Sequence, residues 1–233
     1  MTHSADFAQY LESNQCFDYD HPSVQELLEN LLADFSGDTK AKVIRLYQHV
    51  RDGYAYNPYV FDLSAQQFKA SHCVAQEQSY CIPKAVLFGT LCRAIGVPAR
   101  IGLVDVKNHI SSPRLIELLQ SDVFVMHGYT EIYLDGRWLK ATPAFDGALC
   151  KFMGIAPMEF NAEEDSIFQE YNLDGDKHME YLTYHGTFSD VPAKKIFTAV
   201  STAYPHLDSR LRERALAAGS SLEQDLSSER VSS

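Results

Sequence analysis

The segment Ser79–Arg100 reads SYCIPKAVLFGTLCRAIGVPAR, and it predicts the central element of the fold. Proline is tolerated in the first turn of a helix and serine is a common cap, so we expect a helix that begins near Cys81. Apolar residues then recur at helical spacing as far as Ile95, and Gly96 followed by Pro98 marks the end. Because this helix is apolar on most faces, we expect it to lie inside the core.

An antiparallel sheet is expected after this helix. Residues 99–106 and 123–134 are typical of strands. Asp135-Gly136 is a strong signal for a two-residue hairpin, so residues 137–145 are expected to return as the partner strand.

Helices are also expected before Ser79. Apolar spacing predicts one over residues 23–35, with Ser23 or Asp20 as its cap, and a second that starts after Asp38 and ends at Gly53. The stretch between Gly53 and the central helix reads as a long loop with short elements. The predicted class is therefore α+β, with N-terminal helices and a central cysteine-bearing helix packed on an antiparallel sheet.

Composition limits the functional classes. The 233 residues are 45% hydrophobic and 22% charged, as expected for a globular chain. A net charge of −11 argues against nucleic-acid and anionic-membrane partners, because both need basic surface. No apolar run approaches the ~20 residues of a membrane helix, and the first residues lack the features of a secretory signal. We therefore expect a soluble, cytoplasmic protein.

The five cysteines are odd in number and contain no Cys-x-x-Cys pair. This argues against a disulfide scaffold or a zinc site, and we expect neither a metal nor a cofactor. No repeat or low-complexity linker divides the first ~200 residues. We predict one domain over 1–205, with a core of about 20–147 and a C-terminal elaboration of strands and ordered loops over 148–205. Residues 206–233 are expected to form a helix over 207–218 and then a disordered tail.

Cys81 is the candidate nucleophile. It is expected in the first turn of the buried helix, where free backbone N–H groups and the helix dipole favour a thiolate and lower the thiol pKa. The same N–H groups can hold an oxyanion. Cys92, inside the helix among apolar residues, is expected to be inert.

His127 is the candidate base, because imidazole is the usual partner of a nucleophilic thiol. Gly128 next to it permits another segment to come close. The expected hairpin register places His127 opposite Ala144, with Thr142 and Asp146 as diagonal neighbours. A hydroxyl or carboxylate there could orient the imidazole, as in a catalytic triad.

Three motifs resemble the transglutaminase-like superfamily: YCIPKA at 80–85, LCRAIGVPAR at 91–100 and HGYTEIYLDGRW at 127–138. The resemblance extends over about residues 20–147. It implies a papain-like Cys-His-Asp arrangement on an α+β core. The family includes peptidases, amide-cleaving deglycosylases and protein cross-linkers.

Two positions depart from the family pattern. The family usually has Asp-Pro-Thr after the hairpin, whereas this chain has Thr142-Pro143-Ala144, so Thr142 stands where the orienting carboxylate is expected. A hydroxyl can accept a bond from imidazole but cannot neutralise imidazolium. Asp146 is the candidate replacement. Ser79 stands where the family usually has glycine, two residues before the cysteine.

These features lead to one functional hypothesis and one alternative. The hypothesis is a cysteine hydrolase or acyltransferase, in which Cys81 attacks a peptide or protein amide and forms a thioester that water or an amine resolves. Hydrolysis is favoured over cross-linking, because the chain is short and shows no second acyl-acceptor module. The alternative is a weakly active or inactive member of the fold that binds proteins or peptides, which Thr142 makes credible.

Overall fold

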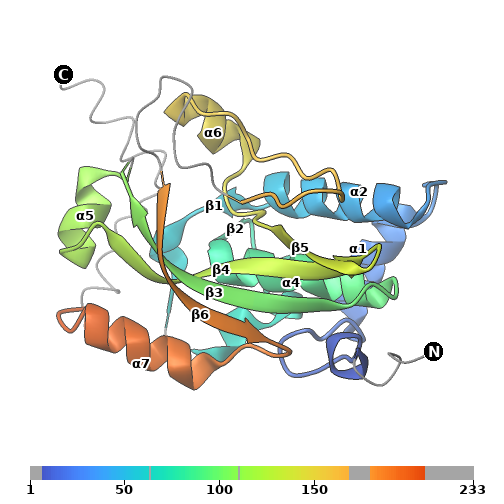
Figure 1. Cartoon of the computed structure of the whole chain (residues 1–233), viewed down its shortest axis with the longest axis horizontal. Helices are drawn as coiled ribbons and strands as arrows, with labels where there is room; N and C mark the ends of the chain where they lie inside the picture. The colour runs from blue at the N-terminus through green and yellow to red at the C-terminus, as the bar shows by residue number, and fades with distance from the viewer. Residues whose placement is uncertain (1–6, 63, 110, 168–178, 208–233) are drawn as a thin grey trace.

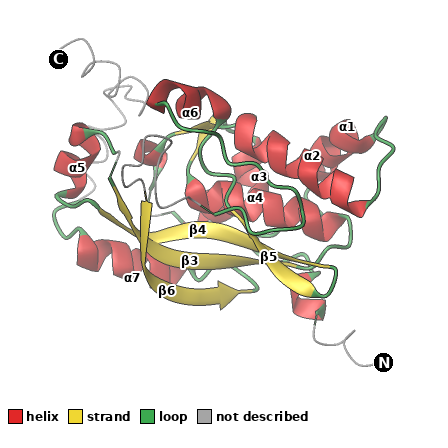
Figure 2. Ribbon diagram, turned by 45° about the horizontal axis from the view of Figure 1, so that its top comes forward, coloured by secondary structure: helices red, strands yellow, loops and turns green. Residues whose placement is uncertain are grey.

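The computed structural model describes residues 7–62, 64–109, 111–167 and 179–207. Its main sheet has four antiparallel strands in the order β5-β4-β3-β6. Helices α1 to α4 lie on one side of this sheet (Figure 2), and α5 and α7 lie toward one end of its strands (Figure 1). The α+β class and the antiparallel sheet predicted from the sequence are confirmed. No described helix is long and apolar enough to cross a membrane.

The sheet follows the expected strands closely, with one correction. Its strands are β3 (Ala99–Asn108), β4 (Val123–Leu134), β5 (Arg137–Ala141) and β6 (Met179–Phe188). Leu134 pairs with Arg137 around Asp135-Gly136, where both turn residues have positive φ. The expected extension of β5 to residue 145 is wrong, because Thr142 donates its N–H to Ser166 and Pro143 has none to donate.

The first two helices have the expected positions. Helix α1 is Pro22–Leu32 and α2 is Thr39–Asp52. The Asp38 side chain caps α2 by accepting the N–H of Ala41 at 2.9 Å, as predicted. The predicted cap of α1 is wrong, because its capping side chain is the His21 ring, which accepts the N–H of Ser23.

The stretch before the central helix contains short elements, as expected of it. They are β1 (Ala55–Tyr56), α3 (Ala70–Val74), β2 (Gln78–Ser79) and two 3-10 turns, Pro58–Val60 and Ala65–Phe68. A further 3-10 turn, Ala8–Tyr10, lies near the N-terminus. Strands β1 and β2 pair in parallel, with Tyr56 opposite Ser79. This pairing holds Tyr56 beside the start of the central helix.

Helix α4 (Cys81–Ala94) is the central helix, and its residues from Ile82 to Arg93 are all buried. It packs against β3 and β4, and its end is the predicted one, because Gly96 has φ +80° and donates its N–H to Arg93. Ser79 is not its cap, since Ser79 belongs to β2 and the preceding Tyr80 occupies the cap position without a side-chain bond.

Lys84 is fully buried in α4, where a lysine needs partners for its ammonium group. Its Nζ donates to the carbonyls of Arg51 at 2.8 Å and Tyr54 at 2.7 Å. These bonds connect the end of α2 and the loop after it to the central helix. Burial lowers the pKa of Lys84 to about 8, and the charge of Asp146 opposes that shift.

Three short helices were not predicted: α5 (Pro113–Leu119), α6 (Gly147–Met153) and α7 (Ala193–Ala203). The first two have seven residues each, too short for a clear apolar period. Ile196 of α7 belongs to the same core cluster as α4. The helix predicted over 207–218 lies outside the described residues after Leu207, and so does the tail after it.

Candidate active site

The start of α4 lies directly against β4. A Cβ atom built on Gly128 would be 2.9 Å from the Cα atom of Ile82. Only glycine therefore fits at position 128 without moving the helix, and the expected role of Gly128 is confirmed. Cys81 is the first residue of α4, so the contact brings its thiol to the strand that carries His127.

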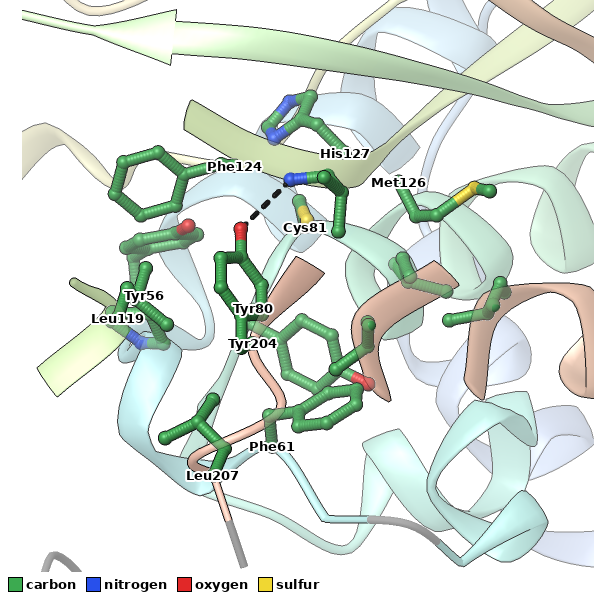
Figure 3. A pocket seen from close by; sticks show the side chains of 15 residues that line it. Tyr56, Phe61, Tyr80, Cys81, Leu119, Phe124, Met126, His127, Tyr204 and Leu207 are labelled. Carbon is green, nitrogen blue, oxygen red and sulfur yellow. Dashed lines mark hydrogen bonds between the residues drawn. The ribbon is translucent and has the colours of Figure 1, made fainter. Parts of the chain in front are cut away.

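Cys81 and His127 line one cavity with a volume of about 110 Å³ (Figure 3). Tyr56 and Tyr80 contribute to its wall from the segment before α4. Tyr204, which follows α7, contributes from the C-terminal side. The two residues that the sequence assigns to nucleophile and base thus meet at the same internal space.

Burial controls the charge of the thiol. Cys81 keeps part of its surface accessible, but protein atoms surround the sulfur, and this desolvation raises the pKa of the thiol to about 11. Hydrogen bonds from the N–H groups of Gly128, Ile82 and Cys81 itself act in the opposite direction. The expected lowering of the pKa is therefore wrong in its net direction, because the helix-start groups do not compensate for lost water.

His127 is buried, with 6% of its surface exposed. Desolvation lowers the pKa of its imidazole to about 4. The ring is thus neutral at pH 7, which is the form that can accept a proton. The site at rest holds a neutral thiol and a neutral imidazole.

A β-bulge immediately before His127 shapes β4. Val104 pairs with His127 and Val106 pairs with Phe124, so Asp105 alone lies opposite two residues of β4. The second of these two, Met126, has φ +59°. The Asp105 carboxylate accepts the N–H of Met126 at 2.9 Å and stabilises this conformation.

His185 of β6 supports the bulge from the other side. Its Nε2 lies 2.7 Å from the same oxygen of Asp105 that accepts the Met126 N–H. The chain His185–Asp105–Met126 therefore connects three strands to the backbone that carries His127. The only sequence signal for it is that Asp105 interrupts the apolar run of residues 101–106 within β3.

The C-terminal segment covers the edge of β4 at the cavity. Strand β5 pairs with β4 only from Thr130 to Leu134. Closer to the bulge, the Tyr204 hydroxyl accepts the N–H of Val125 at 3.0 Å (Figure 3) and donates to the carbonyl of Val123 at 2.6 Å. Tyr204 thus satisfies backbone groups that a neighbouring strand would otherwise pair.

Asp146 has structural tasks in this fold. One carboxylate oxygen accepts the N–H of Leu149 at 2.9 Å and caps α6, while the other accepts the N–H of Tyr56 at 2.8 Å. Both bonds hold segments that border the cavity. The sequence pattern did not reveal this, because the start of α6 was not predicted.

Thr142 is also buried. Its N–H donates to Ser166 at 3.0 Å, and its carbonyl accepts the Tyr47 hydroxyl at 3.2 Å. These bonds fix the backbone at the position where the family usually has its orienting carboxylate.

Within the described ranges, no group of three His, Cys, Asp or Glu side chains could hold a metal ion. Several cavity residues were missed by the sequence reasoning, and only the aromatic ones among them have a signal, a high content of tyrosine and phenylalanine, 13 of each. Their positions in the sequence give no period that would identify them. They include Phe61, Leu119, Phe124, Val200, Tyr204 and Leu207.

Comparison with known proteins gives a family and a distant structural similarity. The model of the transglutaminase-like superfamily matches residues 25–143, just over half of the chain. No curated protein matches. One solved structure that the chain resembles is that of a candidate cysteine protease from Cytophaga hutchinsonii, with 18% identity and a TM-score of 0.44. The match covers 80% of this chain and 56% of the other, so the chain spans little more than half of that protein's length.

Proposed function

Since the chain belongs to the transglutaminase-like superfamily, we propose that it is a cysteine-dependent amide hydrolase or acyltransferase in which Cys81 and His127 form the catalytic pair. One observation carries the proposal: the first residue of the central helix and the histidine of β4 line the same cavity. The match includes both residues, and the motifs around them resemble those in which the family carries its nucleophile and base.

The charge states favour attack by a thiol that loses its proton during the reaction. The Cys81 thiol has a pKa of about 11, so pH 7 is about four units below it and the thiolate is rare. His127, with a pKa of about 4, is neutral and takes the proton from Sγ as the sulfur bonds to the amide carbonyl carbon. The imidazolium then gives that proton to the leaving amine as the C–N bond breaks.

The start of α4 supplies donors for the oxyanion. The N–H groups of Cys81, Ile82 and Gly128 all point at the sulfur. A carbonyl oxygen attached to the attacked carbon lies close to the same groups, which can stabilise the negative charge of the tetrahedral intermediate. His127 then takes a proton from water or an amine as it attacks the thioester carbonyl, and it gives this proton to Sγ as the C–S bond breaks.

The alternative is a binding protein without turnover. Two observations favour it: Thr142 replaces the usual carboxylate, and Asp146 uses both carboxylate oxygens to hold α6 and Tyr56. In that case neither Thr142 nor Asp146 neutralises the imidazolium that forms during attack. Formation of an acyl-enzyme separates the two functions, because a binding module forms none.

The test is acylation of Cys81 by activated para-nitrophenyl esters, followed as release of nitrophenolate and located by peptide mass spectrometry. We expect an acyl group on Cys81 in the wild type and none in Cys81→Ala. His127→Asn is expected to slow acylation at pH 7 by about 10²–10⁴-fold, as for loss of a general base.

His49→Asn is the matched control, because His49 is a partly buried histidine that lies on α2. It should acylate at the wild-type rate. Equal rates in wild type and His127→Asn, with both variants folded by circular dichroism, contradict the assignment of the base. Absence of any acyl-Cys81 contradicts the enzymatic function and favours the binding module.

A further inference from the structure

We propose that the cavity beside Cys81 binds the acyl half of the substrate and selects a compact, uncharged, branched aliphatic group of about four or five carbon atoms. This inference rests on the proposed function and adds to it a chemical class of substrate. It predicts an amide with a leucine-sized or valine-sized group next to the attacked carbonyl, and it disfavours a glutamine-like or acidic acyl group.

The chemistry of the cavity wall is the first support. Apart from Cys81 and His127, its described lining residues are aromatic, aliphatic, proline or methionine side chains. None of them is an aspartate, glutamate, lysine or arginine. A charged acyl group would lose its water there and gain no partner, which is strongly unfavourable.

The phenol groups in the wall do not change this preference, because two of the three already have partners. The Tyr80 hydroxyl donates to the side-chain oxygen of Gln67. The Tyr204 hydroxyl bonds to the backbone of Val123 and Val125. An amide group such as that of glutamine would compete with these bonds, whereas an aliphatic group leaves them intact.

Size is the second support. The cavity volume of about 110 Å³ is smaller than the roughly 150 Å³ of an engineered apolar cavity that binds benzene. By that comparison it accommodates about four or five carbon atoms rather than six. A long straight chain has to extend out of it into solvent, and an acetyl group leaves most of it empty.

The acyl half is assigned to this space for a kinetic reason. The acyl group stays on Sγ after the amine has left, and its binding site must therefore adjoin the sulfur throughout the thioester stage. The amine must diffuse away. A partly open apolar cavity that is lined by Cys81 suits the part of the substrate that stays.

Part of the cavity wall lies outside the family-matched residues. Ile196, Val200, Tyr204 and Leu207 all line the cavity, and all lie after the family-matched residues 25–143. Tyr204 anchors this segment on β4 through its two backbone bonds. The C-terminal segment therefore completes a wall whose other residues, like the proposed reacting groups, lie within the family-matched part of the chain.

The experiment compares para-nitrophenyl esters of acetic, isobutyric, isovaleric, octanoic and succinic acids on the full chain. In each case Sγ forms a bond to the acyl carbon, the C–O bond breaks, nitrophenolate leaves, and His127 takes the thiol proton. Each added methylene that becomes buried is worth about fourfold in acylation rate. We expect the isobutyrate and isovalerate esters to acylate Cys81 roughly 10- to 50-fold faster than the acetate ester, and the octanoate and succinate esters to acylate it slowly.

Val200→Phe tests the position of the binding site. It adds a ring to the cavity wall and is expected to abolish the advantage of the isovalerate ester over the acetate ester. Ser201→Phe adds the same ring on an exposed neighbour in α7 and should retain the wild-type preference.

The outcomes separate the two proposals. Acylation of Cys81 at rates independent of chain size, or fastest with succinate, overturns the aliphatic class while the catalytic pair stands. An unchanged preference in Val200→Phe overturns the assignment of this cavity. No acyl-Cys81 with any ester overturns the proposed function and this inference together.

Discussion

Gly128→Ala tests whether the contact between α4 and β4 positions the nucleophile. The new methyl group would lie 2.9 Å from both Cα and Cγ1 of Ile82 and 3.3 Å from its backbone nitrogen. Ordinary carbon contacts are about 3.5–4 Å, so the start of α4 must move away from β4 by roughly 0.5–1 Å. The moving atoms include backbone, which cannot adjust by a change of rotamer alone.

The expected effect on stability combines two terms. Overpacking of this kind costs about 1–3 kcal/mol in the free energy of unfolding. Replacing glycine in a strand returns roughly 0.5–1 kcal/mol through lower entropy of the unfolded chain. The net loss is about 1–2 kcal/mol, which for a chain of this length lowers Tm by roughly 2–8 °C.

The expected effect on reactivity is larger, because Gly128 also donates its N–H toward the Cys81 sulfur. A displacement of up to about 1 Å between reacting groups can cost about 10²-fold in rate. We expect Gly128→Ala to acylate Cys81 ten- to a hundredfold more slowly at a temperature where both proteins are folded. Differential scanning calorimetry and nitrophenolate release measure the two effects.

Gly89→Ala is the matched control. It also crowds the interior of α4, where its Cβ atom would lie 2.7 Å from the Phe17 ring, but it lies away from Cys81. It should change stability without changing the rate of acylation. The reasoning is refuted if Gly128→Ala keeps both its Tm and its acylation rate, or if the two variants lose the same reactivity.

Three further predictions concern single buried groups. The pKa of Lys84 is about 8 in the folded state and 10.5 in the unfolded chain, so the free energy of unfolding should rise by up to about 3 kcal/mol from pH 8 to 10.5. Urea unfolding should show this gain in wild type relative to Lys84→Met. Parallel curves of unfolding free energy against pH for the two proteins would contradict it. The pKa of His127 is about 4 in the folded state and 6.5 in the unfolded chain, so wild type should lose up to about 3 kcal/mol in the free energy of unfolding as pH falls from 6.5 to 4. His127→Asn should lack this loss in the same assay. An equal loss in both proteins would disprove that the imidazole is buried in its neutral form. Asp105→Ala removes the acceptor of the Met126 N–H, so it should lower the free energy of unfolding by about 1.5–3 kcal/mol and slow acylation of Cys81. Asp105→Asn should recover most of the stability. If Asp105→Ala loses neither stability nor acylation rate, the bulge does not depend on Asp105.

Local sequence signals predicted the elements that carry the reacting groups. The helix from Cys81 to its glycine stop and the Asp135-Gly136 hairpin were predictable, because each depends on residues within one or two turns of chain. The period of apolar residues also placed α2 and β4. Gly128 was recognisable as a close-approach position because it adjoins the histidine.

Other features depend on contacts between distant segments, and local pattern could not give them. Tyr204 reaches Val123 and Val125 across about 80 residues, and Asp146 reaches Tyr56 across 90. The thiol pKa follows the same rule. Its first-turn position alone predicts a lowered value, but the walls that exclude water come from β4, α7 and the segment before α4.

The sequence by itself was enough to assign the family and the α+β class and to identify Cys81 and His127 as candidate nucleophile and base, since short local motifs carry all of these. Only the tertiary structure decided that the two groups share a small apolar cavity, that both are neutral at rest, and that the C-terminal segment closes the wall. Solvation and cavity shape arise from the packing of segments far apart in the chain, and no local pattern of residues encodes them.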